Sequence, residues 1–255
     1  MLDNKERYLY DEPAEYKGLE IYPIKMKDFS AFNYSIGSLL LDKDSIPDVN
    51  VINMTYYEFL MYVSAKIENI LDKPSYKLDM LLRICFNLDR TPSNSPILYG
   101  EYKNKLAFQI KDTIFTSNDF DEIRNIIILQ NEIETVNPNM KKETRELLDK
   151  AREQKAKISS EKQCGLEDQM ICLSIATGMT LDDIYNMTVR KFRRYIRRVD
   201  HKIHYEIYKT ASMSGFVEFK DKNFPKHWMI DLDVEDKYDD VLVSFDSVAE
   251  KIEKT

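Results

Sequence analysis

Histidines are the first residues to consider for chemistry, because imidazole is the commonest metal ligand in proteins. His201 and His204 stand three positions apart, next to Asp200 and Glu206. On a helix this spacing could place two imidazoles on one face, where they could hold a divalent cation. The only other histidine, His227, has no such spacing, and no HExxH pattern occurs. We therefore expect no metal site and interpret both side chains as the polar flank of an amphipathic helix.

Nucleophilic and phosphate-binding motifs are also missing from the sequence. No GxGxxG, GxxxxGKS/T or GxSxG pattern occurs, so neither a phosphate-cradling loop nor a nucleophile elbow is indicated. Cys164 has no histidine near it in the sequence. Cys85, Cys164 and Cys172 form no CxxC pair, and few, scattered cysteines are typical of a reducing compartment. We predict that the protein is not an enzyme and uses no cofactor.

Composition narrows the classes of partner. The 255 residues carry a formal net charge of −7, with 43% apolar and 32% charged residues. An acidic chain argues against nucleic acid as the partner, because affinity for nucleic acid comes largely from neutralised phosphates. No apolar run comes near the roughly 20 residues of a membrane span. The first seven residues are polar and charged where a signal peptide would become apolar. We expect a soluble, intracellular protein without membrane contact.

A long amphipathic helix is predicted from Thr188 to about residue 210, since apolar residues recur in steps of three and four. These apolar residues are Val189, Phe192, Ile196, Val199, Ile203 and Ile207. The basic residues that flank them are Arg190, Lys191, Arg193, Arg194, Arg197 and Arg198. The basic cluster fits a solvated face, a contact with an acidic partner or with the chain's own acidic tail, or a contact with phosphates.

An aromatic segment follows the long helix and contains the only tryptophan, Trp228. Residues 213–219 and 224–229 are apolar and aromatic without regular periodicity. One interpretation is that the segment folds back over the long helix as core. The other is an exposed anchor for a partner, since Trp, Phe and Met are favoured in binding hot spots. The predicted partner-binding residues on the helix and this segment are Phe192, Arg193, Arg194, Ile196, Arg197, Phe216, Phe219 and Trp228.

The sequence patterns around these residues predict an α+β, mainly α-helical fold. Thr55 and Glu58 form a capping-box pattern at the start of one helix. Residues 97–115 alternate in the way of strands and predict a small antiparallel β meander, with turns at 99–101 and 103–105. Gly178 is placed to end a helix as its C′ residue.

Four regions follow from pattern and charge. Residues 1–140 are expected to form an N-terminal α+β lobe that contains the meander. Residues 141–162 are charged and poor in apolar side chains, so we interpret them as a helical linker. Residues 163–230 are expected to form a C-terminal helical lobe. Residues 231–255 are an acidic tail.

Three groups of segments resemble proteins of tailed bacteriophages and prophages of Gram-positive hosts. The first group is residues 21–24 (IYPI), 28–29 (DF), 41–43 (LDK) and 52–56 (INMTY). The second is residues 119–124 (DFDEIR) and 130–133 (QNEI). The third is residues 177–180 (TGMT) with Ile184, Met187, Thr188 and Phe192, and it is similar to a pattern of short helices in phage tail assembly proteins.

The implied family is the tail assembly chaperones. The resemblance implies a non-catalytic protein of the host cytoplasm that binds the phage tape measure protein, with the tail tube protein as a further candidate partner. A structural virion protein, such as a baseplate or connector component that forms homo-oligomers, is the alternative within the same setting. A nucleic-acid binder that uses the helix at 190–198 is a second alternative.

Overall fold

The computed structural model describes residues 4–43, 46, 48–91, 93–94, 96–135, 144, 147–151, 154, 164–217, 219 and 225–230. Contacts group the chain into two units. The first is residues 1–135 with 179–194, and the second is residues 136–178 with 195–255. Helix α10, Val189–Met213, has its first residues in the first unit and continues in the second.

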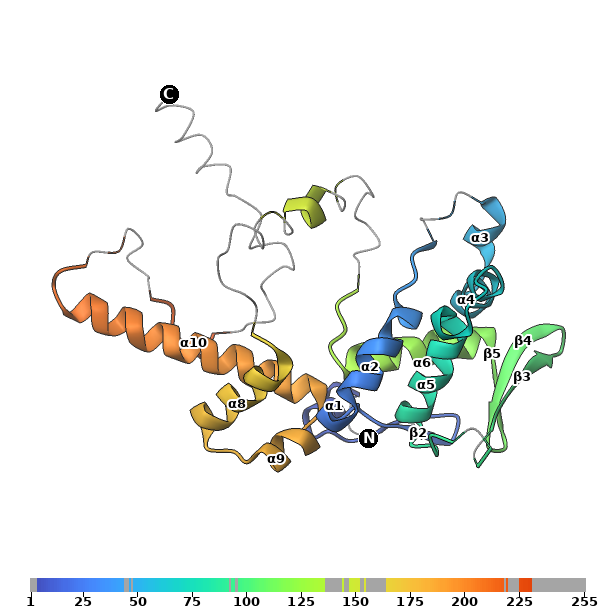
Figure 1. Cartoon of the computed structure of the whole chain (residues 1–255), viewed down its shortest axis with the longest axis horizontal. Helices are drawn as coiled ribbons and strands as arrows, with labels where there is room; N and C mark the ends of the chain where they lie inside the picture. The colour runs from blue at the N-terminus through green and yellow to red at the C-terminus, as the bar shows by residue number, and fades with distance from the viewer. Residues whose placement is uncertain are drawn as a thin grey trace, which may run out of the picture. The chain divides into compact units, whose positions relative to one another are not determined.

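The first unit combines short helices with two small antiparallel sheets (Figure 1). Its helices are α1 Asn4–Leu9, α2 Phe29–Ser35, α3 Val49–Asn53, α4 Tyr56–Ala65, α5 Pro74–Cys85, α6 Ser117–Gln130 and α9 Leu181–Asn186. Short 3-10 turns are η1 Met26–Asp28, η2 Ile36–Leu39 and η4 Ile70–Asp72. Strands β1 Ala14–Tyr16 and β2 Leu19–Ile21 pair with each other.

The predicted meander consists of β3 Ile97–Tyr102, β4 Lys105–Ile110 and β5 Thr113–Thr116, in the order β3-β4-β5. The turn at Lys103 and Asn104 is confirmed, and both residues have the positive φ that a tight hairpin turn requires. The turn predicted at 99–101 is wrong. Gly100 continues β3 and pairs with Ala107, because strand pairing there overrides the local preference of glycine for a turn.

Aromatic side chains form the centre of the first unit. Tyr57, Phe108, Phe115 and Phe120 are each at most 1% exposed. The ring centroids of Tyr57 and Phe120, and those of Phe108 and Phe115, lie 5.3 Å apart, within the range of favourable aromatic pairs. This cluster joins α4 and α6 to the meander, and Figure 1 shows these elements together at one end of the picture.

Local capping fixes where the helices start. The Thr55 side chain accepts from the Glu58 N–H, and the Glu58 carboxylate accepts from the Thr55 N–H at 2.8 Å, so the predicted capping box is confirmed. Helix α6 begins with the same device, since Thr116 N–H donates to Asp119 at 2.7 Å. Each box satisfies amide donors that a helix start otherwise leaves unpaired.

The second unit contains α8 Leu166–Thr177, which buries Met170 and Leu173. Gly178 ends α8 with φ of 75°, as predicted for a C′ glycine. Residues 147–151 are helical, but most of the predicted linker 141–162 lies outside the described residues, as does the acidic tail. The mainly α-helical α+β class is confirmed, while the four-region division stays a prediction.

Among the helices of the described residues, none combines the length and apolar character needed to cross a membrane.

Candidate protein interface on helix α10

Backbone pairing inside the first unit fixes the start of α10. The Val189 N–H donates to the Ile24 carbonyl at 2.8 Å, and the Met26 N–H donates to the Met187 carbonyl at 2.9 Å. Lys25 and Thr188 thereby form an isolated antiparallel bridge. The segment just before α10 is therefore held by backbone hydrogen bonds to residues 24–26.

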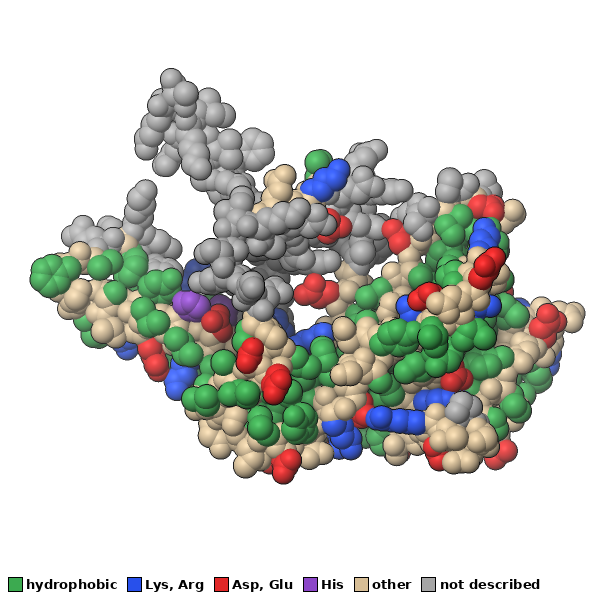
Figure 2. Space-filling view, viewed as in Figure 1, with side chains coloured by type: hydrophobic (Ala, Val, Ile, Leu, Met, Phe, Trp, Pro, Cys, Tyr) green, Lys and Arg blue, Asp and Glu red, His purple; other side chains and the backbone are tan. Residues whose placement is uncertain are grey.

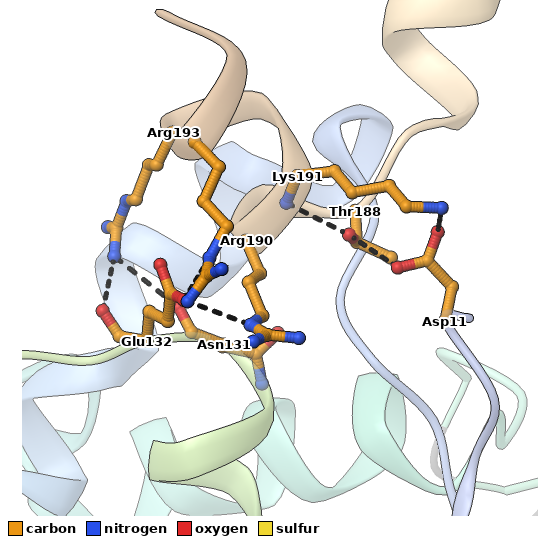
Figure 3. Close-up of polar contacts among 8 residues, drawn as sticks. Asp11, Asn131, Glu132, Thr188, Arg190, Lys191 and Arg193 are labelled. Carbon is orange, nitrogen blue, oxygen red and sulfur yellow. Dashed lines mark hydrogen bonds and ion pairs between the residues drawn. The ribbon is translucent and has the colours of Figure 1, made fainter. Parts of the chain in front are cut away.

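Glu132 holds the first turns of α10 through its side chain and its backbone (Figure 3). Its carboxylate pairs with Arg190 at 3.0 Å and also with Arg194. The Arg193 guanidinium donates to the Glu132 carbonyl at 3.0 Å. Three arginines of the predicted basic cluster thus bind one residue of their own unit.

Asp11 makes a second anchor on the other side of the helix start (Figure 3). The Thr188 hydroxyl donates to Asp11 at 2.9 Å, and the Lys191 ammonium lies 2.6 Å from the same carboxylate. Thr188 also accepts from the Lys191 N–H at 3.2 Å, which caps the helix start. Asp11 therefore joins the N-terminal segment of the chain to the beginning of α10.

Both acidic anchors have left-handed backbone, with φ of 59° at Asp11 and 47° at Glu132. This conformation costs a non-glycine residue roughly 1–2 kcal/mol. Glu132 follows the end of α6, where glycine is usual, but glycine would have no carboxylate to pair with Arg190 and Arg194. The preceding Asn131 is fully buried and accepts from the Ile24 N–H at 2.9 Å. The end of α6 and the strand-like segment at Ile24 are thus tied together where α10 begins.

Five of the predicted partner-binding residues lie on α10 itself. Phe192 is 3% exposed and belongs to the core of the first unit. Arg193 and Arg194 face Glu132, as described above. Ile196 is half-buried and Arg197 is exposed in the second unit. The prediction that these residues bind a partner stays a prediction.

In the second unit, the aromatic segment packs back against α10. The Arg198 guanidinium donates to the carbonyls of Trp228 and Ile230 at 2.9 and 2.6 Å. The rings of Tyr205 and His227 meet edge to face, with centroids 5.1 Å apart. A similar contact joins Tyr208 to Phe219. Phe219 and Trp228 are half-buried, whereas Phe216 is 95% exposed. Phe219 and residues 227–230 therefore lie against α10, as the fold-back interpretation predicts, but none of them is buried as core, and Met213, Phe216 and Met229 are exposed.

An apolar strip remains exposed on the second part of α10. We call Ile196, Val199, Ile203 and Ile207 the α10 stripe. Ile196 and Val199 are half-buried, while Ile203 is 47% exposed and Ile207 is 57% exposed. This part of the helix lies at the left of Figures 1 and 2, where hydrophobic side chains are interspersed with polar ones on the visible surface. Exposed apolar surface of this kind marks a candidate interaction site.

The predicted metal and nucleophile candidates have ordinary surroundings. His204 Nδ1 lies 3.1 Å from the Asp200 carbonyl, within one turn of the same helix. No group of three or more potential metal ligands forms among the residues that the structure describes. Desolvation, with the nearby Asp168 carboxylate adding to it, raises the pKa of Cys164. A raised pKa makes this exposed thiol a weaker nucleophile at neutral pH.

Helix α10 lies in a region of the chain that matches a known protein family model. Residues 157–233 match the family model described as the YomV second domain. The match indicates a phage-type protein. Searches of curated proteins and of solved structures find no match to the chain. The matched range contains α8, α9, α10 and the segment up to Ile230, so the α10 stripe lies inside it.

Sequence reasoning missed the two anchors. Asp11 lies 177 positions before Thr188, and Glu132 lies 58 positions before Arg190. No local spacing connects residues so far apart, although the excess of arginine in one helix does signal that acidic partners exist. The periodicity identified Ile203 and Ile207, but it did not distinguish them from the buried Phe192.

Proposed function

We propose that this chain is a non-catalytic phage protein that acts as a tail assembly chaperone in the host cytoplasm. Its partner is the tape measure protein, of which it binds apolar helical segments, and the tail tube protein is a second candidate. The observation that carries this proposal is the exposed α10 stripe, which lies within the region matched to a phage-type family.

The stripe has the chemistry of a helix-binding surface. An amphipathic helix normally buries its apolar face against another element, and Ile203 and Ile207 are left exposed. Burying an isoleucine side chain contributes about 1.5–3 kcal/mol. Two or three such residues therefore suffice for a weak, reversible contact, which suits a chaperone that must release its partner.

The arginines favour protein binding over phosphate binding. Arg190 and Arg194 pair with Glu132, and Arg198 holds two carbonyls of its own unit. A phosphate would have to compete with these contacts. Most of the basic cluster thus has an internal partner, which supports an apolar rather than an electrostatic binding surface.

Co-expression with the tape measure protein from the same phage tests the proposal. The full chain should co-purify with that protein and increase its soluble fraction. Replacing Ile203 and Ile207 with serine should abolish both effects without unfolding the chain, because these side chains are exposed. The matched control is Ile52→Ser, which changes an isoleucine of the first unit that is 72% exposed and should leave binding intact.

Two results would contradict the proposal. The first is that the full chain neither co-purifies with the tape measure protein nor changes its solubility. The second is that mass spectrometry of purified particles finds the chain in fixed copy number, which would identify a structural virion protein instead.

A further inference from the structure

The contacts of the aromatic segment leave the α10 stripe uncovered. Successive residues of an α-helix turn by about 100°, which places Arg198, Tyr205 and Tyr208 roughly 120–200° around the axis from Ile196. These are the residues that contact Phe219, His227, Trp228 and Ile230. The described residues of the segment therefore pack on the face of α10 opposite to the stripe. Whatever covers the stripe must come from another part of the chain or from another molecule.

The chain itself has a second apolar stripe of matching form. Residues 231–255 lie outside the described part of the structure, but their sequence shows the spacing of an amphipathic helix. Val241, Phe245, Val248 and Ile252 follow one another in steps of four, three and four. The α10 stripe has steps of three, four and four. Two helices with such stripes can pack along each other through side chains of similar size.

The place where this segment begins brings it within reach. Ile230 is held at α10 by the Arg198 guanidinium, at 2.6 Å. Residues 231–240 can span up to roughly 33 Å when extended. The stripe from Ile196 to Ile207 is only about 17 Å long, and the helix with its side chains is about 10–12 Å wide. The connection is therefore long enough to pass around α10 to its uncovered face.

Charge favours the same pairing. Between residues 195 and 213, α10 carries the cations Arg197, Arg198, Lys202 and Lys209, and the carboxylates Asp200 and Glu206. Between residues 231 and 246, the tail has one cation, Lys237. Its carboxylates in that range are Asp231, Asp233, Glu235, Asp236, Asp239, Asp240 and Asp246. Opposite net charges draw the two segments together, most strongly at low ionic strength.

We propose that the C-terminal segment 238–253 docks as an amphipathic helix on the α10 stripe and covers it until a partner displaces it. This inference rests on the proposed function, because it makes the stripe a binding site that the chain itself occupies. The apolar face of the segment contacts Ile203 and Ile207, and its acidic residues lie beside Lys202 and Lys209. The tail thereby covers the exposed side chains of the α10 stripe when no partner is present.

Hydrogen exchange of purified protein tests this docking without any partner. Three chains are compared with the full chain: one that ends at Ile230, one with Phe245→Asp, and one with Ser247→Asp. Truncation and Phe245→Asp should speed exchange of α10 amides at 200–213 at least severalfold and should increase binding of an apolar dye. Ser247→Asp adds the same charge off the apolar face and should behave like the full chain. A synthetic peptide of residues 231–255, added to the truncated chain, should restore protection.

Unchanged exchange and dye binding after truncation would overturn the proposal. So would protection that depends on protein concentration and on a dimer mass in light scattering, since a second copy would then be the occupant. Co-purification with the tape measure protein separates this inference from the proposed function. If the double variant Ile203→Ser, Ile207→Ser loses the partner but truncation changes neither exchange nor dye binding, only the docking of the tail is wrong and the proposed function stands. If truncation exposes the stripe and no tape measure protein binds, docking stands and the proposed function fails.

Discussion

The apolar face of helix α10 runs from Val189 and Phe192 into the α10 stripe, but the two parts of this face have opposite surroundings. At the start, Phe192 is buried, and Arg190, Arg193 and Arg194 bind Glu132. Farther along, Ile203 and Ile207 are about half exposed. The first part therefore belongs to a core and the second offers a surface, although the sequence pattern is the same in both.

The difference arises from what faces each part. The first turns meet residues that are distant in sequence, namely Asp11, Ile24 and Glu132, through hydrogen bonds and ion pairs. In the second part, the described contacts of the aromatic segment lie on the face opposite to the stripe. An amphipathic helix thus shows that an apolar face exists, while tertiary contacts decide whether that face is core or interface.

The largest expected effect is on the free energy of unfolding, and it should distinguish the buried part of the apolar face from the exposed part. Phe192→Ala should lower the free energy of unfolding by about 3–5 kcal/mol, because it leaves a cavity in the first unit. In the chain that ends at Ile230, Ile207→Ala should change it by less than about 0.5 kcal/mol, because that side chain is then largely solvated. Urea unfolding followed by circular dichroism measures both. Equal losses would show that the second part of the stripe is buried as deeply as the first.

A smaller loss of stability is expected when the contacts of Glu132 with α10 are removed. Glu132→Ala should lower the free energy of unfolding by about 2 kcal/mol, because Arg190 and Arg194 lose a charged, half-buried acceptor. Glu134→Ala, two residues away at an exposed position, is the matched control and should have little effect. The same urea titrations measure both variants. A neutral result for Glu132→Ala would mean that the backbone pairing and the contacts of Asp11 hold the start of α10 without Glu132.

Local features of this fold could be predicted and distant ones could not. The Thr55–Glu58 capping box and the end of α8 at Gly178 depend on a few neighbouring residues, and both predictions are confirmed. The turn predicted at 99–101 failed because Gly100 pairs with Ala107 in the adjacent strand.

The candidate site shows the same limit. Spacing identified the stripe of α10 and its basic flank. The exposure of Ile207 and the burial of Phe192 depend on contacts with residues far away in the sequence, for which periodicity holds no signal.

Low pH should destabilise the first unit without any substitution in α10. Burial raises the pKa of Asp119, but its contacts with Lys17, Thr116 and Tyr16 outweigh that effect and bring the pKa down to about 2. The Lys17 ammonium lies 2.7 Å from the carboxylate, and the Tyr16 hydroxyl donates to it at 2.9 Å. The unfolded chain has a pKa near 3.9. The stabilisation is therefore complete above about pH 4 and is lost as pH falls through about 2.

The expected loss is at most about 2 kcal/mol, since one pKa unit corresponds to about 1.4 kcal/mol. Urea titrations between pH 5 and pH 2 should show it, and Asp119→Asn should make the dependence on pH shallower. Asp112→Asn, at an exposed turn of the meander, removes the same charge from the unit and is the matched control. If Asp119→Asn keeps the slope of the unmodified chain, this carboxylate does not stabilise the unit that anchors α10.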